Sequence, residues 1–217
     1  HIFEERLEKP NRISPANGAR PSGPPSFDFD NAPFLVLWEV TRACDLACRH
    51  CRAEAQEQAL PGELSTEECF RLLDNIKEFG HPIVVLTGGD PLKRPDILDI
   101  IKYGTRIGLK MTMTRSGTPL VTRDRIQEVK EAGLTRLAVS LDGATPETHD
   151  DFRGIAGSWQ WTMNCIKYAQ EFDLPVQINT TFARYNKDDF QALVDVMMEL
   201  GISLWSVFFL VPTGRGR

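Results

Sequence analysis

Residues 34–51 read FLVLWEVTRACDLACRHC, a short apolar run followed directly by three cysteines, Cys44, Cys48 and Cys51. The spacing C-x3-C-x2-C brings three thiolates to one point, with no fourth cysteine nearby. A metal centre held by three protein thiolates keeps one coordination position open, whereas structural sites are mostly closed by four ligands. We therefore expect a reactive metal centre immediately after the first strand, and the identity of the metal decides the function.

The composition indicates a folded domain outside the membrane. The 217 residues are 41% hydrophobic, enough to fill the core of one α/β barrel-type domain. The net charge of −5 includes no basic block, which argues against nucleic acid as the main partner. No apolar run reaches the roughly 18 residues of a membrane span, and no signal peptide opens the chain. Five cysteines, three of them bunched, favour a reducing, cytoplasmic location over a secreted disulfide framework.

The chain divides into two parts. Residues 1–33 are rich in proline and carry no apolar period, so we interpret them as an N-terminal leader or linker. Residues 34–217 alternate short apolar runs with amphipathic segments and form the predicted core domain. The predicted strands are 34–40, 83–87, 109–114, 136–141, 175–181 and 204–211.

Helical patterns lie between these strands. The first begins at Ser65, whose side chain and that of Glu68 form a predicted capping box, and it ends at Gly80. The other predicted helices are 95–107, 123–132, 159–172 and 187–200. Six strands separated by helices predict a parallel sheet with right-handed crossovers, either an open doubly wound sheet or a curved, barrel-like one.

The unusual polar residues follow the ends of the predicted strands. In α/β folds the carboxyl ends of the strands form the edge where active sites lie, although glycine, proline and aspartate are also ordinary turn residues. The clusters are the three cysteines, Gly88-Gly89-Asp90-Pro91, Arg115-Ser116-Gly117, Asp142-Gly143, Asn179-Thr180-Thr181 and Pro212-Thr213-Gly214.

Three metal or redox interpretations of the cysteines compete. A zinc site would need one histidine as its fourth ligand, and a redox pair of the C-x2-C type would leave the third cysteine unexplained. An iron–sulfur cluster held by three thiolates fits best. Cys69 and Cys165 lie within predicted helices, where we expect them to pack in the core.

Several of these motifs together resemble those of the radical S-adenosylmethionine (radical SAM) enzymes, over about residues 34–217. The cysteine run with His50 before its last cysteine is similar to the signature of that superfamily, and Thr87-Gly88-Gly89-Asp90-Pro91 is similar to its GGE-type motif. The run 139–143 looks like its fourth-strand segment. Residues 148–154 and 209–214 resemble the branch that makes molybdopterin precursors, haem-related tetrapyrroles and SPASM-type modified peptides.

The resemblance implies a partial (β/α)6 TIM-like barrel of parallel strands with outer helices. It also implies that Cys44, Cys48 and Cys51 ligate a 4Fe-4S cluster, whose fourth iron binds S-adenosylmethionine. The residues implied to contact the cosubstrate are His50 beside the adenine, Gly88 and Gly89 through close backbone approach, Asp90 at the ammonium group, Ser140, Asp142, Asn179 and Val211. Arg115 and Arg153 are expected at the barrel mouth, where each either holds an anionic group or is solvated.

The implied activity is reductive cleavage of S-adenosylmethionine to a 5′-deoxyadenosyl radical, which abstracts hydrogen from a peptide or tetrapyrrole-like substrate. The implied partners are that substrate and a low-potential electron donor such as ferredoxin or flavodoxin. We also expect the chain to be truncated, without the C-terminal auxiliary domain of many relatives. The alternative is a non-catalytic zinc- or cluster-binding interaction module.

Overall fold

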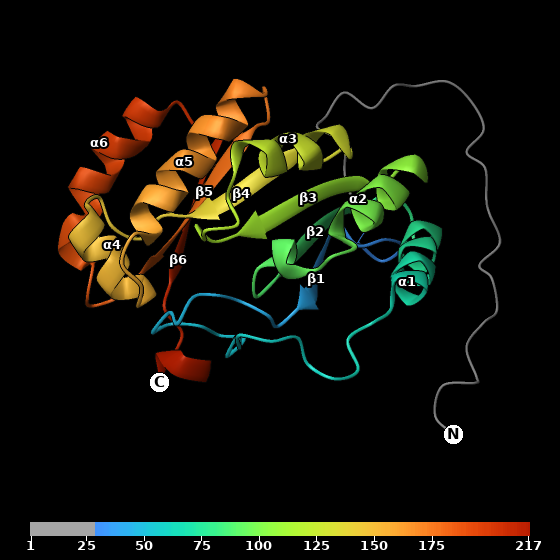
Figure 1. The fold of residues 1–217 in the computed structure, drawn as a ribbon, viewed down its shortest axis with the longest axis horizontal. Helices are drawn as coiled ribbons and strands as arrows, with labels where there is room; N and C mark the ends of the chain where they lie inside the picture. The colour runs from blue at the N-terminus through green and yellow to red at the C-terminus, as the bar shows by residue number, and fades with distance from the viewer. Residues whose placement is uncertain (1–28) are drawn as a thin grey trace.

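The structure, a computed structural model, describes residues 29–217 (Figure 1). The predicted leader, residues 1–33, lies outside the described residues apart from its last five. All six predicted strands are confirmed, with ends that differ by at most two residues. They are β1 Leu35–Thr41, β2 Ile83–Gly88, β3 Lys110–Arg115, β4 Arg136–Ser140, β5 Val176–Phe182 and β6 Leu204–Phe209.

The helices follow the predicted pattern with one addition. They are α1 Thr66–Glu78, α2 Ile97–Arg106, α3 Arg123–Glu131, α4 Pro146–Arg153, α5 Ser158–Glu171 and α6 Phe190–Leu200. The capping box of α1 is confirmed, because the Glu68 amide donates to Ser65 Oγ and the Ser65 amide donates to Glu68 Oε2. Helix α4 was not predicted, and α6 begins later than predicted because residues Lys187–Asp189 form a separate 3₁₀ turn.

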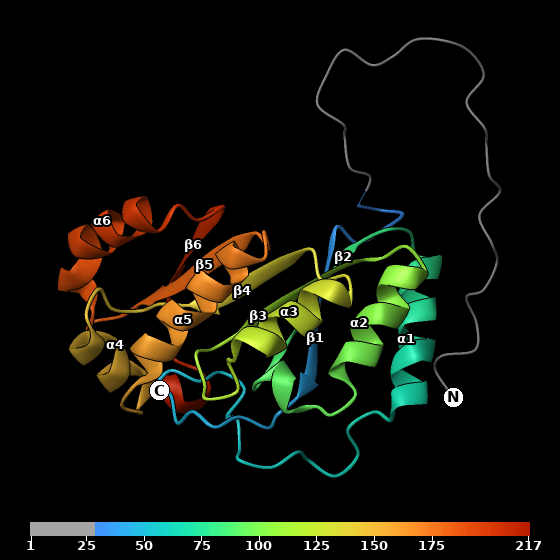
Figure 2. The same ribbon diagram turned by 45° about the horizontal axis from the view of Figure 1, so that its top comes forward.

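The strand order settles the choice between the two predicted sheet types. The order is β1-β2-β3-β4-β5-β6, and every neighbouring pair is parallel. Doubly wound sheets reverse their strand order at a switch point and carry helices on both faces. Here the order follows the sequence, and the helices lie along one side of the sheet (Figure 2). The sheet is therefore a partial TIM-like barrel, as predicted.

The core lies between the outer face of the sheet and the helices. Alternate residues of the strands point outward and are fully buried, among them Leu86, Met111 and Val139. Helices α1 and α5 contribute Cys69 and Cys165 to this core, so the prediction that both thiols serve packing is confirmed. Between residues 29 and 217, none of the helices combines the length and apolar character needed to cross a membrane.

Candidate functional site

A cavity of about 380 Å³ lies where the carboxyl ends of the strands meet residues 44–51, which we call the cysteine segment. All three cysteines line it, although they come from a loop after β1 and not from the sheet itself. Six of the other predicted site residues line the same cavity: His50, Gly88, Gly89, Ser140, Asn179 and Val211. The carboxylates of Asp90 and Asp142 do not, and the structure gives each another role.

Main-chain hydrogen bonds hold the cysteine segment in place, since it contains no helix or strand of its own. The Cys44 amide donates to the Gln56 carbonyl at 2.6 Å, and the Gln56 amide donates to the Arg42 carbonyl at 2.9 Å. The Glu63 carboxylate accepts from the Arg42 amide and from Thr41 Oγ1. Partial burial works against ionisation of Glu63, but these hydrogen bonds outweigh it and lower its pKa. Sequence reasoning assigned no role to Glu63, which anchors the entry to the loop.

Each of the three cysteine sulfurs accepts one hydrogen bond. Donors to sulfur are a property of iron–sulfur sites, where they stabilise thiolate charge and tune the reduction potential. Burial raises the pKa of the Cys44 thiol to about 11, so a metal that binds there must displace the proton. The donors are the Leu46 amide for Cys44 (3.4 Å), the Ala55 amide for Cys51 (3.4 Å) and the Arg153 guanidinium for Cys48 (3.7 Å).

The three thiols line one cavity together. Within the described part of the chain, no group of three or more His, Cys, Asp or Glu side chains is placed to hold one metal ion. A cluster binds each cysteine at a different iron, so its ligands would enclose a volume. The cavity also extends to Gly88 and Gly89, which form the diglycine turn.

The diglycine turn fastens the end of β2 to the cysteine segment. The Gly89 amide donates to the Thr41 carbonyl at 2.8 Å, and the Asp90 amide donates to the Ala43 carbonyl at 2.7 Å. A Cβ atom on Gly88 would lie 2.3 Å from the Thr41 oxygen, and one on Gly89 would lie 2.2 Å from the Ala43 oxygen. The missing side chains therefore make room for the protein's own backbone. Cosubstrate approach, the reason predicted from sequence, is at most a second use of these glycines.

The prediction for the Asp90 side chain needs correction. Asp90 is fully buried, and its carboxylate accepts from Arg115 Nη2 at 2.9 Å, from Thr118 Oγ1 at 2.7 Å and from the Leu92 amide at 3.1 Å. Both carboxylate oxygens of Asp90 therefore accept hydrogen bonds from the protein and are shielded from the cavity, so this side chain does not contact an ammonium group there. Arg115 is likewise fully buried in this ion pair and is not solvated.

Asp142 shows the same arrangement with the second arginine. Its carboxylate forms a buried ion pair with Arg153 and also accepts from the Thr181 amide at 2.7 Å. Burial raises the pKa of Asp142, and Arg153 opposes that rise. Arg153 also contacts Cys48 Sγ, so a chain of contacts runs from Asp142 through Arg153 to a predicted cluster ligand. The predicted contact of Asp142 with the cosubstrate is therefore replaced by a contact with Arg153, which Asp142 orients. Arg153 is buried and is not solvated.

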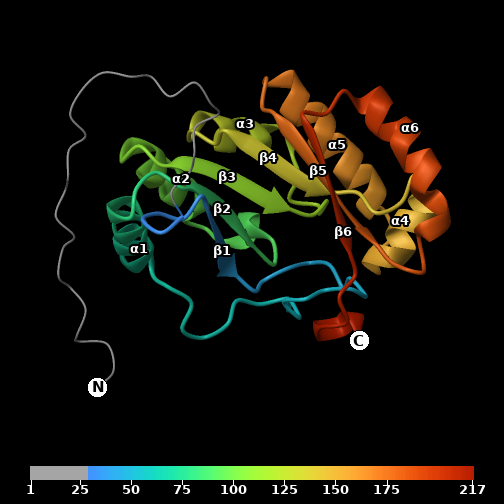
Figure 3. The same ribbon diagram turned by 180° about the vertical axis from the view of Figure 1, so that it is seen from behind.

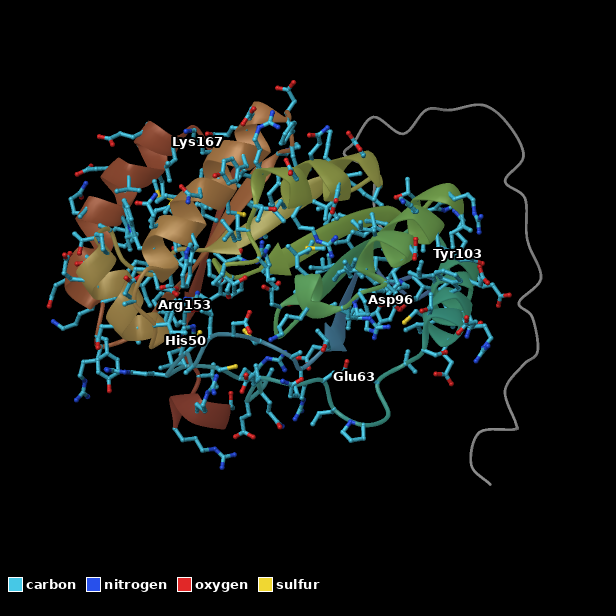
Figure 4. The ribbon with its side chains drawn as sticks, in the orientation of Figure 1. His50, Glu63, Asp96, Tyr103, Arg153 and Lys167 are labelled. Carbon is cyan, nitrogen blue, oxygen red and sulfur yellow. The ribbon has the colours of Figure 1, made fainter. Side chains whose placement is uncertain are left out.

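His50 packs against an aromatic ring of the protein, and its place beside an adenine stays a prediction. Its imidazole stacks on Phe152, with ring centroids 4.2 Å apart and planes 16° from parallel. Burial, with Arg153 and Arg215 nearby, lowers the pKa of His50 to about 3, so the ring is neutral. Figure 4 shows His50 and Arg153 close to each other beneath α4. Phe152 and Arg153 both belong to α4, the helix that sequence analysis missed.

The remaining predicted residues of the cavity come from the later strands and the segment after β6. Ser140 is the last residue of β4 and Asn179 is its partner in β5. The Asn179 side-chain oxygen accepts from Gln177 Nε2 at 2.9 Å, so this side chain caps no loop. Val211, the last residue of the predicted strand 204–211, lies beyond the end of β6 and is 65% exposed.

Comparisons with known proteins identify the family. The model of the "Radical SAM superfamily" matches residues 38–197. The chain is 44% identical over 181 residues to the AdoMet-dependent heme synthase of Oleidesulfovibrio alaskensis, covering 83% of this chain and 46% of that protein. It is 32% identical over 190 residues to the mycofactocin maturase MftC of Mycobacterium ulcerans, covering 86% and 50%. The chain thus spans about half the length of the curated relatives it matches.

A solved structure supports the fold. The crystal structure of Streptococcus suis SuiB bound to S-adenosylmethionine aligns with a TM-score of 0.72 at 19% sequence identity. The alignment covers 83% of this chain and 41% of that one, so it bears on the barrel alone. The family model covers most of the chain, including all three cysteines and the diglycine turn. The chain belongs to the radical SAM superfamily.

Proposed function

We propose that this chain is the catalytic barrel of a radical SAM enzyme whose substrate is a tetrapyrrole. The family uses a 4Fe-4S cluster and S-adenosylmethionine, which together supply a 5′-deoxyadenosyl radical able to abstract hydrogen from carbon. The observation that carries the proposal is the shared cavity. Three thiols from one loop and the ends of β2, β4 and β5 line the same space of about 380 Å³.

The chain's own residues have separable tasks in this proposal. Cys44, Cys48 and Cys51 hold the cluster, and Arg153 donates to the Cys48 sulfur from its buried pair with Asp142. Arg153 is thereby a positioning residue, because it reaches the cluster through a ligand. A cationic donor at a cluster sulfur stabilises the reduced, more negative state, which raises the reduction potential.

The rest of the cavity lining suits the cosubstrate. Backbone carbonyls at Gly88 and Gly89, the Ser140 hydroxyl and the Asn179 amide offer polar contacts. Val211 and the His50 ring offer apolar surface for an adenine. Asp90 and Asp142 are assigned no contact, because their carboxylates are engaged within the protein.

The choice of substrate class rests on sequence similarity. The relative named for haem synthesis is 44% identical to this chain, whereas the relative named as a mycofactocin maturase is 32% identical. We therefore propose that hydrogen abstraction takes place on a tetrapyrrole side chain, with a peptide substrate as the second candidate. We further propose a cytoplasmic location and a low-potential electron donor such as ferredoxin or flavodoxin.

Anaerobic reconstitution tests this proposal directly. The reconstituted protein is expected to bind about four irons and four sulfides, to lose visible absorbance on reduction, and to release 5′-deoxyadenosine when dithionite and S-adenosylmethionine are added. Cys48→Ala should abolish both cluster retention and cleavage. Cys165→Ala is the matched control, because that thiol is buried in α5. Stoichiometric zinc without iron, or a cluster that yields no 5′-deoxyadenosine, would overturn the proposal in favour of a binding module.

A further inference from the structure

The inner face of the sheet encloses a second, larger cavity of about 940 Å³. Its walls include inward-facing residues from all six strands, and Figure 3 shows this face without a helix across it. Thr87, Asn179 and Phe208 line both this cavity and the cysteine cavity, so the two adjoin. Its volume lies at the upper end of the range for small-molecule sites. A ligand in it would reach the cysteine end of the barrel.

Small side chains keep this space open. Bulky Val, Ile and Leu side chains normally fill the interior of a TIM barrel in layers. Here the middle of the inner face carries Thr112 on β3, Ala138 on β4 and Ser206 on β6. The residues beside them in sequence, such as Met111 and Val139, are large and point outward into the core. The hollow is therefore a consequence of residue choice on one face of otherwise well-packed strands.

The middle of the wall offers little hydrogen bonding to a ligand. Thr112 Oγ1 donates to the Val84 carbonyl at 3.1 Å. Gln177 Nε2 donates to Asn179 Oδ1 at 2.9 Å and to Ser206 Oγ at 3.2 Å. The Gln177 amine and the Thr112 hydroxyl thus donate within the wall, and Leu37 and Val85 add aliphatic surface beside them. Such a wall suits a broad apolar body.

The charges in the cavity lie at its far end. Lys110 and Arg136 are the first residues of β3 and β4, so they mark the rim opposite the cysteines. Among residues 29–217, neither side chain has an ion-pair or hydrogen-bond partner, whereas the Glu39 carboxylate is paired with Arg52. The cavity thus carries two uncompensated positive charges in a chain whose net charge is −5. Uncompensated cations facing a cavity are suited to a carboxylate ligand.

Strand geometry sets the length of the ligand. Thr114 is four positions after Lys110, and Ser140 is four positions after Arg136, which is about 13 Å at 3.3 Å per residue. A matching ligand has a flat apolar body of that extent, carboxylates at one end and a reacting side chain at the other. A tetrapyrrole with several propionate groups has this form.

We propose that the inner cavity binds a tetrapyrrole polycarboxylate, with Lys110 and Arg136 holding the propionates remote from the reacting side chain. This inference rests on the proposed function and adds a recognition site to it. The cation pair fixes which edge of the macrocycle faces the cysteine end. A propionate there is placed for hydrogen abstraction, while those held by the cations are withheld from it.

Binding of iron coproporphyrin III, a tetracarboxylate macrocycle, tests the inference. Titrations of the reconstituted protein are followed by the Soret absorbance under anaerobic conditions. Lys110→Gln and Arg136→Gln are each expected to weaken binding about tenfold, and the double variant more than either. Lys110→Arg and Arg136→Lys should restore most of the affinity. Lys102→Gln on the exposed side of α2 is the control, and iron content and thermal unfolding verify folding.

A second probe separates charge from shape. The tetramethyl ester of the same macrocycle lacks the carboxylates, so it should bind the wild-type protein and the double variant equally. If the double variant binds iron coproporphyrin III as tightly as the wild type, the inference is wrong. An acidic peptide that occupies the site and that the macrocycle fails to displace would also overturn it.

The two proposals fail in different ways. Release of 5′-deoxyadenosine without substrate reports on the cysteine cavity, and the Lys110 and Arg136 variants should leave it unchanged. Loss of that release from the wild-type protein would sink the proposed function itself. If 5′-deoxyadenosine is released normally but the Lys110 and Arg136 variants bind the macrocycle as tightly as the wild type, only the inference is wrong.

Discussion

The six strands have two faces that are packed differently, and residues adjacent in sequence belong to different faces. On β2, Leu86 points outward and is fully buried, whereas Val85 points inward and lines the larger cavity. On β4, Val139 is in the core and Ala138 faces the cavity. The outer face is filled with large apolar side chains that hold the helices, and the inner face is hollow. Stability therefore comes mainly from the outer face, and the inner face is free to recognise ligands.

The rim where the two faces meet is expected to be the most sensitive place. Gly89→Ala would put a Cβ atom 2.2 Å from the Ala43 carbonyl oxygen, which is backbone and cannot give way easily. We expect loss of cluster binding and more than about 3 kcal/mol of stability, because the cysteine segment must move. Iron content after reconstitution and urea unfolding measure the two effects.

Gly62→Ala is the matched control for Gly89→Ala. Gly62 lies in the loop between β1 and α1 that also carries the cysteines, and its φ is +87°. A Cβ atom added there would have no other atom within 4 Å. It should lose only about 1–2 kcal/mol from backbone strain and keep its iron. A Gly89→Ala protein with a full complement of iron would show that the turn does not hold the cysteine segment.

A pair of substitutions on β2 tests the difference between the faces themselves. Leu86→Ala removes a side chain from the packed core and should cost about 2–5 kcal/mol. Val85→Ala removes one that borders a cavity and should cost less than about 1.5 kcal/mol. Urea unfolding of the two proteins side by side gives the comparison. Equal losses would contradict the assignment of stability to the outer face.

The fold could be predicted from sequence because periodicity reports which side chains are buried. The alternating apolar runs located all six strands, and the Ser65–Glu68 capping box located the start of α1. Helix α4 escaped because only Phe152 among its eight residues is a large apolar side chain, so no apolar stripe marked it. The available signal was Thr145 followed by Pro146, an N-cap residue before a proline suited to the first turn.

The site was predictable only in part, for a related reason. Motif order placed nine residues around one cavity, because three close cysteines at the end of a strand are rarely needed for packing alone. It failed for Asp90 and Asp142, whose carboxylates turn inward to Arg115 and Arg153. Those arginines follow their partners by 25 and 11 residues, and only the assembled fold brings them together. Charge pairing between elements leaves no periodic trace in a sequence.

The pH dependence of stability offers a smaller effect at the same rim. His149 is buried, and its Nδ1 accepts from the Asp142 amide at 3.0 Å. Burial lowers its pKa from 6.5 to about 3, with Arg153 and His50 acting in the same direction and Asp150 against it. Between pH 6.5 and 3, His149 is therefore protonated in the unfolded chain and neutral in the folded chain. The free energy of unfolding falls as the pH drops through this range. At pH 5 the loss is about 2 kcal/mol.

His149→Asn should remove that dependence while keeping an acceptor for the Asp142 amide. The difference in unfolding free energy between pH 7 and pH 5 should shrink by about 2 kcal/mol relative to the wild type. His81→Asn is the control, since His81 is exposed and its loss should leave the pH profile unchanged. An unaltered profile in His149→Asn would mean that this histidine takes up its proton in the folded state.

The smallest expected change in stability comes from filling the hollow. Ala138→Leu extends a side chain into the inner cavity, where space is available, so the free energy of unfolding should change by less than about 1 kcal/mol. Ala169→Leu makes the same substitution in the packed core beneath α5 and should cost about 1–3 kcal/mol through overpacking. Thermal and urea unfolding of both proteins provide the measurement. If Ala138→Leu proves as costly as Ala169→Leu, the inner face is packed in solution. If it proves harmless, the space at Ala138 is available to a ligand.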